Sequence, residues 1–133
     1  MRNSCYFRVA VKVKNLRQVL GREGEKAAEQ YLRKKGYRVV ERNYRCSAGE
    51  VDLIVLDRRV VVFVEVKTRT DYRFGTPLEA VEFRKQRKMI QAAQFFLSQN
   101  RLYEREARFD VVGISWPNGG PVIEHIINAF ELV

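Results

Sequence analysis

Residues 50–69 read E-V-D-L-I-V-L-D-R-R-V-V-V-F-V-E-V-K-T-R. They form two short apolar runs that are rich in β-branched residues and are joined by Asp57-Arg58-Arg59. Runs of this length and composition are typical of buried strands, so the stretch predicts a β-hairpin. With Arg58 and Arg59 as the turn, Asp57 faces Val60, although Arg-Arg is not a favoured hairpin turn.

Four ionisable side chains interrupt the predicted hairpin. Counting from the turn places Asp52 opposite Glu65 and Glu50 opposite Lys67. Because side chains alternate between the two faces of a strand, all four are expected on one face, at the end far from the turn. The same counting puts both neighbours of Asp52 on the opposite face. A bulge would shift the register by one residue and separate the four charges.

Opposed carboxylates repel each other unless a cation lies between them. The repulsion between Asp52 and Glu65 is expected to cost a few tenths to ~1 kcal/mol when exposed, and more when desolvated. A divalent cation such as Mg²⁺ or Mn²⁺ turns this repulsion into coordination, because hard cations take carboxylate, carbonyl and water oxygens. Lys67 would then stand beside the metal, where it could orient a water or neutralise charge on a phosphate.

The composition fits a small basic globular protein. The chain has 133 residues, a length that fits one domain, and a formal net charge of +9. Such a charge suggests a polyanionic partner, most often nucleic acid, and the alternative is a basic protein without such a partner. No apolar run is long enough to span a bilayer, and the first residues do not read as a signal peptide, so no membrane partner is expected.

Cysteine and histidine usage narrows the chemistry. Cys5 and Cys46 lie far apart, which fits neither a zinc site nor a disulfide framework and indicates a reducing, cytoplasmic setting. His125 is the only histidine, which argues against His-based zinc sites and Ser-His-Asp chemistry. Any catalytic metal is therefore expected to have oxygen ligands.

A helix is predicted from near Leu16 or Gly21 to Lys35, with Gly36 as its C-terminal stop. Glu25 falls on the apolar stripe of this helix and not among its solvated charges. A carboxylate in that position needs a partner. One interpretation is an ion pair with an arginine, and the other is a further carboxylate delivered to the acidic end of the hairpin.

The remaining elements follow from periodicity and turn residues. Strands are predicted at 37–44, 107–115 and 122–127, and a second helix begins at Thr76-Pro77-Leu78-Glu79 or restarts near Phe83 and runs to about Gln99. The apolar stripe of that helix is expected to include Phe83. Asp110 is expected to pair with Arg108 or another basic neighbour.

Basic residues follow the hairpin closely. Arg69 ends it, Arg73 lies in the loop 70–75, and four more surround the start of the second helix, namely Arg84, Lys85, Arg87 and Lys88. Charge runs are usually solvated faces. Here they lie next to the acidic cluster, so we expect them to contact nucleic-acid phosphates.

The resulting order is α-β-β-β-α-β-β, which predicts an α/β fold with a mixed β-sheet flanked by helices. Residues 16–133 are expected to form one domain. Residues 1–15 carry no motif and are expected to form an N-terminal extension, either a short edge strand or a mobile basic arm.

Taken together, the ordered motifs resemble the PD-(D/E)xK nuclease superfamily, whose fold is restriction-endonuclease-like. They are most similar to the YraN-like uncharacterised protein family, a group similar to archaeal-type Holliday junction resolvases. The resemblance covers roughly Leu20 to Phe130. It rests on Gly24-Glu25, Ala28, Tyr31-Leu32, Gly36-Tyr37, Arg42-Asn43-Tyr44, Gly49-Glu50-Val51-Asp52-Leu53-Ile54, Phe63-Val64-Glu65-Val66-Lys67-Thr68-Arg69, Pro77-Leu78-Glu79-Ala80-Val81, Lys85 and Arg108-Phe109-Asp110-Val111-Val112. One departure is that Val51, not proline, precedes Asp52.

The resemblance implies roles for matching positions. Asp52 and Glu65 would be metal ligands, joined by the backbone carbonyl of Val66, and Lys67 would position or activate the attacking water. Glu25 would complete the acidic site. From the second helix, Gln86 or Lys85 would assist.

Three hypotheses follow. The first is a metal-dependent endonuclease that cleaves DNA, with branched or nicked DNA as candidate forms; a homodimer would suit cleavage of both strands at a junction. The second is a non-catalytic nucleic-acid-binding module on the same fold. The third is an interaction protein in which the same charges form a buried ion network, which contributes little to stability.

Overall fold

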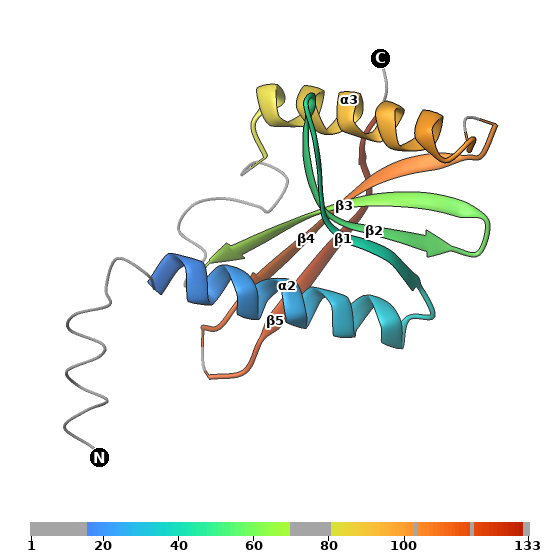
Figure 1. Ribbon diagram of the computed structural model, residues 1–133. Helices are drawn as coiled ribbons and strands as arrows, with labels where there is room; N and C mark the ends of the chain where they lie inside the picture. Colours follow the sequence, from blue (N-terminus) through green and yellow to red (C-terminus); the bar gives the residue numbers. More distant parts are fainter. Residues whose placement is uncertain (1–15, 70–80, 103, 118, 132–133) are drawn as a thin grey trace.

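The computed structural model describes residues 16–69, 81–102, 104–117 and 119–131. They form a five-stranded mixed sheet with a helix on each face (Figure 1). The elements are α2 (Leu16–Lys34), β1 (Arg38–Cys46), β2 (Gly49–Asp57), β3 (Val60–Arg69), α3 (Phe83–Gln99), β4 (Ala107–Ser115) and β5 (Val122–Phe130). The predicted α/β class and the order α-β-β-β-α-β-β are confirmed, and the arrangement is consistent with a restriction-endonuclease-like fold.

The strands lie in the sheet in chain order, β1-β2-β3-β4-β5. Neighbours are antiparallel except β3 and β4, which are parallel. The parallel pair follows from α3, because parallel neighbours need a crossover connection. Figure 1 shows α3 above the sheet, where it packs on β2 and β1, and α2 below it, where it packs on β3, β1 and β4.

The predicted register of the hairpin is confirmed over its inner part. Asp57 faces Val60, and the pairing continues to Leu53 opposite Val64. Arg58 adopts φ 57°, in the left-handed region that tight hairpin turns require. The unfavoured Arg-Arg sequence therefore makes the turn, since the apolar faces of two long strands fix the register.

Two hydrophobic clusters fill the space between the sheet and its helices. One lies under α3 and includes Val51, Ile54, Phe63, Met89 and Phe96. The other lies under α2 and is built from Ala28, Leu32, Leu53, Val55, Val62, Val64, Val112 and Ile114. The central strands therefore bury both faces, which explains their nearly continuous apolar sequence.

The helices follow the prediction with one exception. α2 is stopped by Gly36, whose φ of 94° suits glycine. In α3 the buried face begins at Met89, and Phe83 is 72% exposed. The prediction that Phe83 belongs to the core stripe is wrong, because this first residue of the helix lies before the turns that pack on the sheet. Among the described residues, no helix is long and apolar enough to cross a membrane.

Some predictions fall on parts of the chain that the structure does not describe. These are the N-terminal extension 1–15, the loop 70–75 with Arg73, and the helix start at Thr76.

The predicted pairing of Asp110 with Arg108 is confirmed. Asp110 is completely buried, and its carboxylate accepts hydrogen bonds from Arg108 Nε (3.0 Å) and from the Asn128 amide (3.0 Å). His125 Nε2 lies 2.7 Å from the same carboxylate. Burial alone would raise the pKa of Asp110, but the bonds to His125, Arg108 and Asn128 outweigh it and hold this pKa below its usual range.

Candidate active site

The regular alternation of β2 breaks at Asp52. Val51 and Ile54 both pack under α3, whereas Leu53 packs under α2. Asp52 lines a pocket on the α2 side together with Leu53 and Asn43. Asn43, which faces this position from β1, has φ 50°. Strict alternation, with both neighbours of Asp52 on one face, was therefore a wrong prediction, because the two strands bend together at this point.

This break does not remove Asp52 from the acidic cluster. The Val66 amide on β3 points toward β2 and donates to Asp52 Oδ2 at 2.8 Å. The aspartate carboxylate thus lies in the gap where β2 and β3 separate. From that gap it is close to Glu65 and also raises the pKa of Glu25. The structure thus brings together carboxylates from both strands of the hairpin and from α2.

Glu65 is the most constrained member of the cluster. It is 3% exposed, and its Oε1 atom has no hydrogen-bond partner among the described residues. Its Oε2 atom lies 3.8 Å from the Nζ atoms of both Lys67 and Lys85. Burial, and then the adjacent Asp52 carboxylate with which a protonated Glu65 can share a hydrogen bond, raise the pKa of Glu65 to about 8.

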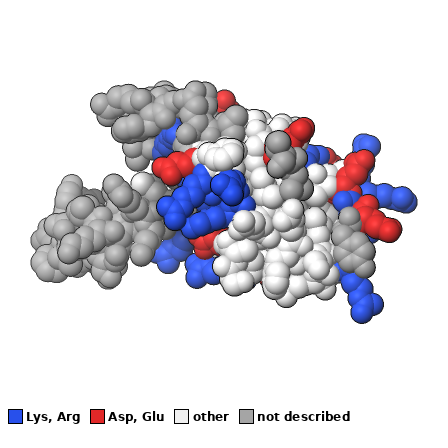
Figure 2. Space-filling view, turned by 90° about the horizontal axis from the view of Figure 1, so that it is seen from above, with Lys and Arg blue, Asp and Glu red and all other residues white. Residues whose placement is uncertain are grey.

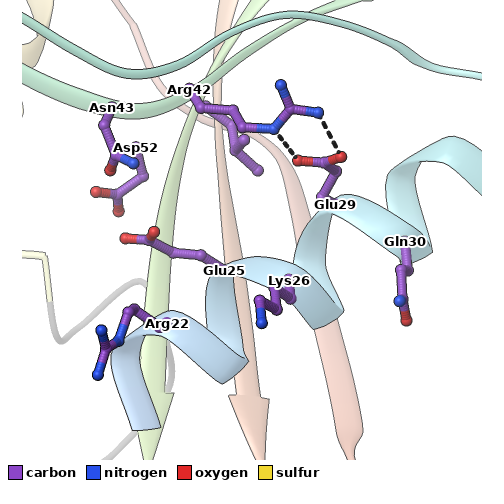
Figure 3. Close-up of a pocket in the computed structure, with 9 residues that line it drawn as sticks. Arg22, Glu25, Lys26, Glu29, Gln30, Arg42, Asn43 and Asp52 are labelled. Atoms are coloured by element: carbon purple, nitrogen blue, oxygen red, sulfur yellow. Dashed lines mark hydrogen bonds and ion pairs between the residues drawn. The ribbon is translucent and has the colours of Figure 1, made fainter. Parts of the chain in front are cut away.

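Glu25 reaches the cluster from α2. It lines a pocket of about 340 Å³, and its carboxylate points toward Asp52 (Figure 3). Burial raises the pKa of Glu25, and the nearby charges of Asp52 and Glu50 raise it further. Of the two interpretations of this residue, the geometry favours a carboxylate delivered to the acidic end of the hairpin.

One turn along α2, Glu29 makes the opposite kind of contact. It accepts two hydrogen bonds from Arg42, at 2.6 Å and 2.8 Å, which Figure 3 shows as a forked pair, and Arg33 lies 3.0 Å from it. Within the same pocket, Glu29 is therefore tied to β1 by Arg42 and paired with Arg33 of its own helix, whereas Glu25 faces another acid.

The donor set fits a hard divalent cation held largely by water. Among the described residues, no group of three or more His, Cys, Asp or Glu side chains is arranged to hold a metal ion. Two carboxylates remain, those of Asp52 and Glu65, and the backbone carbonyl of Val66 is the further ligand that the resemblance implies. Mg²⁺ typically uses one or two carboxylates and keeps several waters. The buried Oε1 atom of Glu65 has no hydrogen-bond partner among the described residues, and a bound cation would satisfy it.

The basic residues separate into two groups. Arg84, Arg87 and Lys88 are exposed on the first turns of α3, and Figure 2 shows Lys and Arg side chains gathered on this face beside acidic ones. Lys85 instead turns inward, 3.8 Å from Glu65 and 3.9 Å from Glu50. Arg69 is half-buried at the end of β3.

Two features of the site depend on packing between elements, although the family resemblance already implied that Lys85 assists there. The link between Lys85 and Glu65 joins positions twenty residues apart, and α3 brings them together by its packing on β2. The bend at Asn43 carries one local signal, since asparagine tolerates positive φ better than most residues.

Two glycines bring both helices close to the acidic end of the hairpin. A Cβ atom on Gly49 would lie 3.1 Å from the Lys88 carbonyl oxygen of α3. A Cβ atom on Gly24 would collide with Oγ1 of Thr68 on β3. The absence of side chains at these positions therefore helps to set where Lys85 and Glu25 stand.

Gly24→Ala is expected to destabilise the fold by about 1–3 kcal/mol, because overpacking at Thr68 pushes α2 away from β3. Gly21→Ala is the matched control, because a Cβ atom there meets nothing within 4 Å. It should stabilise the helix by about 0.5–1 kcal/mol. Urea unfolding of both variants checks this, and equal stabilities would contradict the close approach of α2 to β3.

Comparison with known proteins identifies the family. The pattern of the uncharacterised protein family UPF0102 matches residues 24–114. A UPF0102 protein of Caldanaerobacter subterraneus subsp. tengcongensis is 44% identical over 117 residues, which cover 86% of this chain and 96% of the relative. A UPF0102 protein of Geobacter metallireducens is 47% identical over 113 residues, which cover 85% of this chain and 93% of the relative. A UPF0102 protein of Pelobacter propionicus is 49% identical over 115 residues, which cover 84% of this chain and 82% of the relative. The motifs that resemble the YraN-like group are thus confirmed at the level of the family, and the chain belongs to the uncharacterised protein family UPF0102.

Proposed function

We propose that this chain is a metal-dependent endonuclease that hydrolyses phosphodiester bonds of DNA, with branched DNA among its substrates. The observation that carries the proposal is the environment of Glu65. A stable fold gains nothing from a buried carboxylate with an unpartnered oxygen, another acid beside it and two lysines at 3.8 Å. The two carboxylates can coordinate a cation, and the two lysines can neutralise a phosphate.

Each residue has a chemical role in this proposal. Asp52, Glu65 and the Val66 carbonyl hold Mg²⁺ or Mn²⁺, which supplies an activated water and stabilises negative charge when it is bound. Lys67 orients the attacking water or the phosphate from its position beside Glu65. Glu25 adds a carboxylate on the α2 side of Asp52. The resemblance to PD-(D/E)xK nucleases supports the same assignment.

DNA would approach along the start of α3. Arg84, Arg87 and Lys88 are exposed there, and Lys85 connects that surface to Glu65. Contacts of this kind go to the phosphate backbone and carry little sequence information. Recognition by DNA structure rather than by base sequence follows from them.

A cleavage panel tests the proposal. Duplex, nicked, flap, four-way-junction and single-stranded DNA are incubated with Mg²⁺ and with Mn²⁺, and each reaction is repeated with Asp52→Asn. Cleavage of at least one form by the wild type, and not by the variant, is the expected result. If the wild type binds DNA but cuts none of these forms with either Mg²⁺ or Mn²⁺, the non-catalytic binding module is the better description.

Mg²⁺ affinity is expected to rise with pH up to about 8 and then level off, because Glu65 must lose its proton to bind the ion. The pKa of this group is raised in the fold above 4.5, so the metal-free protein holds the extra proton between 4.5 and about 8. The stabilisation that the proton on Glu65 gives to the folded state is therefore lost as pH rises through that window. Calorimetric titration in buffers of different ionisation enthalpy measures the released proton.

Glu65→Gln is the control for that measurement. It should lose metal binding together with the proton release, and the stability of the metal-free variant should be less sensitive to pH between 4.5 and about 8. A wild-type affinity that does not change with pH would show that the ion displaces no proton from Glu65.

Arg87→Gln with Lys88→Gln is expected to weaken DNA binding and to reduce the slope of log affinity against log salt by about 2, one unit for each lost phosphate contact. Arg38→Gln with Arg59→Gln is the matched control, because it removes the same charge from exposed positions near the hairpin turn. Fluorescence anisotropy at several salt concentrations measures both slopes. Equal slopes for the two double variants would place the DNA elsewhere.

A further inference from the structure

Phe83 is the most exposed large apolar side chain in the part of the chain that the structure describes, at 72%. Single exposed apolar residues are ordinary on protein surfaces. The location of this one is unusual, because it is the first residue of α3 and directly precedes Arg84 and Lys85. Its aromatic ring therefore stands at the start of the basic surface proposed to bind DNA.

Helical spacing fixes what surrounds Phe83. Arg87 lies one turn further along the same side of α3, with about 5–6 Å between Cβ atoms at this spacing. Arg84 and Lys88 form the neighbouring exposed row. Two residues after Phe83, Lys85 reaches to 3.8 Å from Glu65. Fewer than two turns of α3 thus carry an exposed ring, three exposed cations and a lysine that reaches the candidate active site.

A ring among phosphate-binding cations matches the chemistry of an unpaired nucleotide. Each nucleotide carries a phosphate for the cations and a flat base for the ring. In duplex DNA the bases already stack on each other, so an aromatic side chain outside the helix has no face to contact. Proteins that bind single strands combine a basic track with aromatic side chains on which bases stack.

We infer that Phe83 stacks on an unpaired base next to the scissile phosphate, so that the site takes single-stranded DNA or the unpaired arms of branched DNA in preference to plain duplex. The inference rests on the proposed function and adds the substrate class to it. Phe83 acts here as a specificity residue and takes no part in the chemistry.

Phe95 provides a matched control on the same helix. It is 43% exposed and lies twelve residues further along α3, which is roughly 18 Å away at 1.5 Å per residue. Its exposed neighbours Gln91, Gln94 and Ser98 are uncharged. Phe95→Ala therefore removes the same aromatic side chain from an exposed position without touching the basic turn.

The experiment measures binding by anisotropy in EDTA, where cleavage is prevented. The probes are fluorescein-labelled oligothymidylate, a splayed duplex with unpaired arms, and a blunt duplex. Phe83→Ala is expected to weaken binding of the first two by about 5- to 100-fold and binding of the blunt duplex less than about 2-fold. Phe83→Trp should retain binding, whereas Phe83→Leu, which keeps apolar area without a flat ring, should behave like the alanine variant.

The outcomes separate this inference from the proposed function. If no probe binds to the wild type, both fail. If the probes bind and Phe83→Ala affects them no more than Phe95→Ala does, only the stacking role fails. Sedimentation velocity of both alanine variants covers the remaining case, because a shift from dimer to monomer with Phe83→Ala would show that the ring contacts a second copy and would overturn the inference.

Discussion

Asp52→Asn is expected to lower metal-dependent cleavage by about 10³-fold or more, which corresponds to roughly 4 kcal/mol of transition-state stabilisation. The variant removes the negative charge that the cation needs. It keeps an oxygen that can accept the hydrogen bond from the Val66 amide, now 2.8 Å from Asp52 Oδ2. The two strands should therefore stay joined at this point. Initial rates on the preferred DNA of the cleavage panel, in Mg²⁺ and in Mn²⁺, give the measurement.

The stability of Asp52→Asn distinguishes a lost function from a lost fold. Because the substitution also relieves repulsion with Glu65 and Glu25, the melting temperature of the metal-free variant should be unchanged or higher. Glu41→Gln, an exposed carboxylate on β1, is the control and should cleave at the wild-type rate. A fully active Asp52→Asn would contradict the site, and an unfolded one would assign Asp52 a structural role.

The sequence was sufficient for the elements and for the inner register of the hairpin. Strand 107–115 has the bounds predicted for it, and the pairing of Asp57 with Val60 follows from the turn. These features depend on local periodicity and on the burial of both strand faces. Such signals lie within one stretch of sequence, so no knowledge of distant contacts was needed.

The position of Asp52 required the structure. Alternation along β2 predicts one face, but the bend shared with Asn43 gives the carboxylate access to both sides of the sheet. A bend of this kind depends on the neighbouring strand, whose pairing the sequence does not specify residue by residue. Asp52, Glu65 and Lys67 lie together in the gap between β2 and β3, but the ladder between these strands ends at Leu53 and Val64, so Glu50 does not face Lys67 as predicted and lies 3.9 Å from Lys85 instead.

Tertiary packing also decides the roles of residues in the first turn of α3. Phe83 was predicted in the core stripe from its spacing to Ile90 and Ala93, yet the first buried residue of the helix is Met89. Lys85 was predicted with the phosphate-binding residues and, from the resemblance, as an assisting residue of the site, and it lies within 4 Å of two carboxylates. Helical periodicity gives the relative direction of side chains and cannot say at which turn a helix reaches its sheet.

Asp110→Ala is expected to destabilise the protein by about 3–5 kcal/mol, the usual cost of removing one partner from a buried ion pair. The Asp110 carboxylate is completely buried and is the point at which three donors meet, namely Arg108, His125 and the Asn128 amide. Without it, Arg108 keeps Asp57 at 2.9 Å but loses its fully buried partner. A fall in melting temperature of roughly 10–20 °C follows for a chain of this size.

Asp57→Asn is the matched control for that loss. It removes the other carboxylate that Arg108 contacts, but the Asp57 side chain is 32% exposed, so water compensates and the cost should be about 1 kcal/mol or less. The pH dependence gives an independent check. Because the pKa of Asp110 is lowered by folding, its stabilisation is present above the pKa of an unfolded aspartate and is lost as pH falls through the folded value. The wild type should therefore lose stability in acid more steeply than Asp110→Ala does, and parallel curves would mean that this carboxylate does not hold β4 and β5 together.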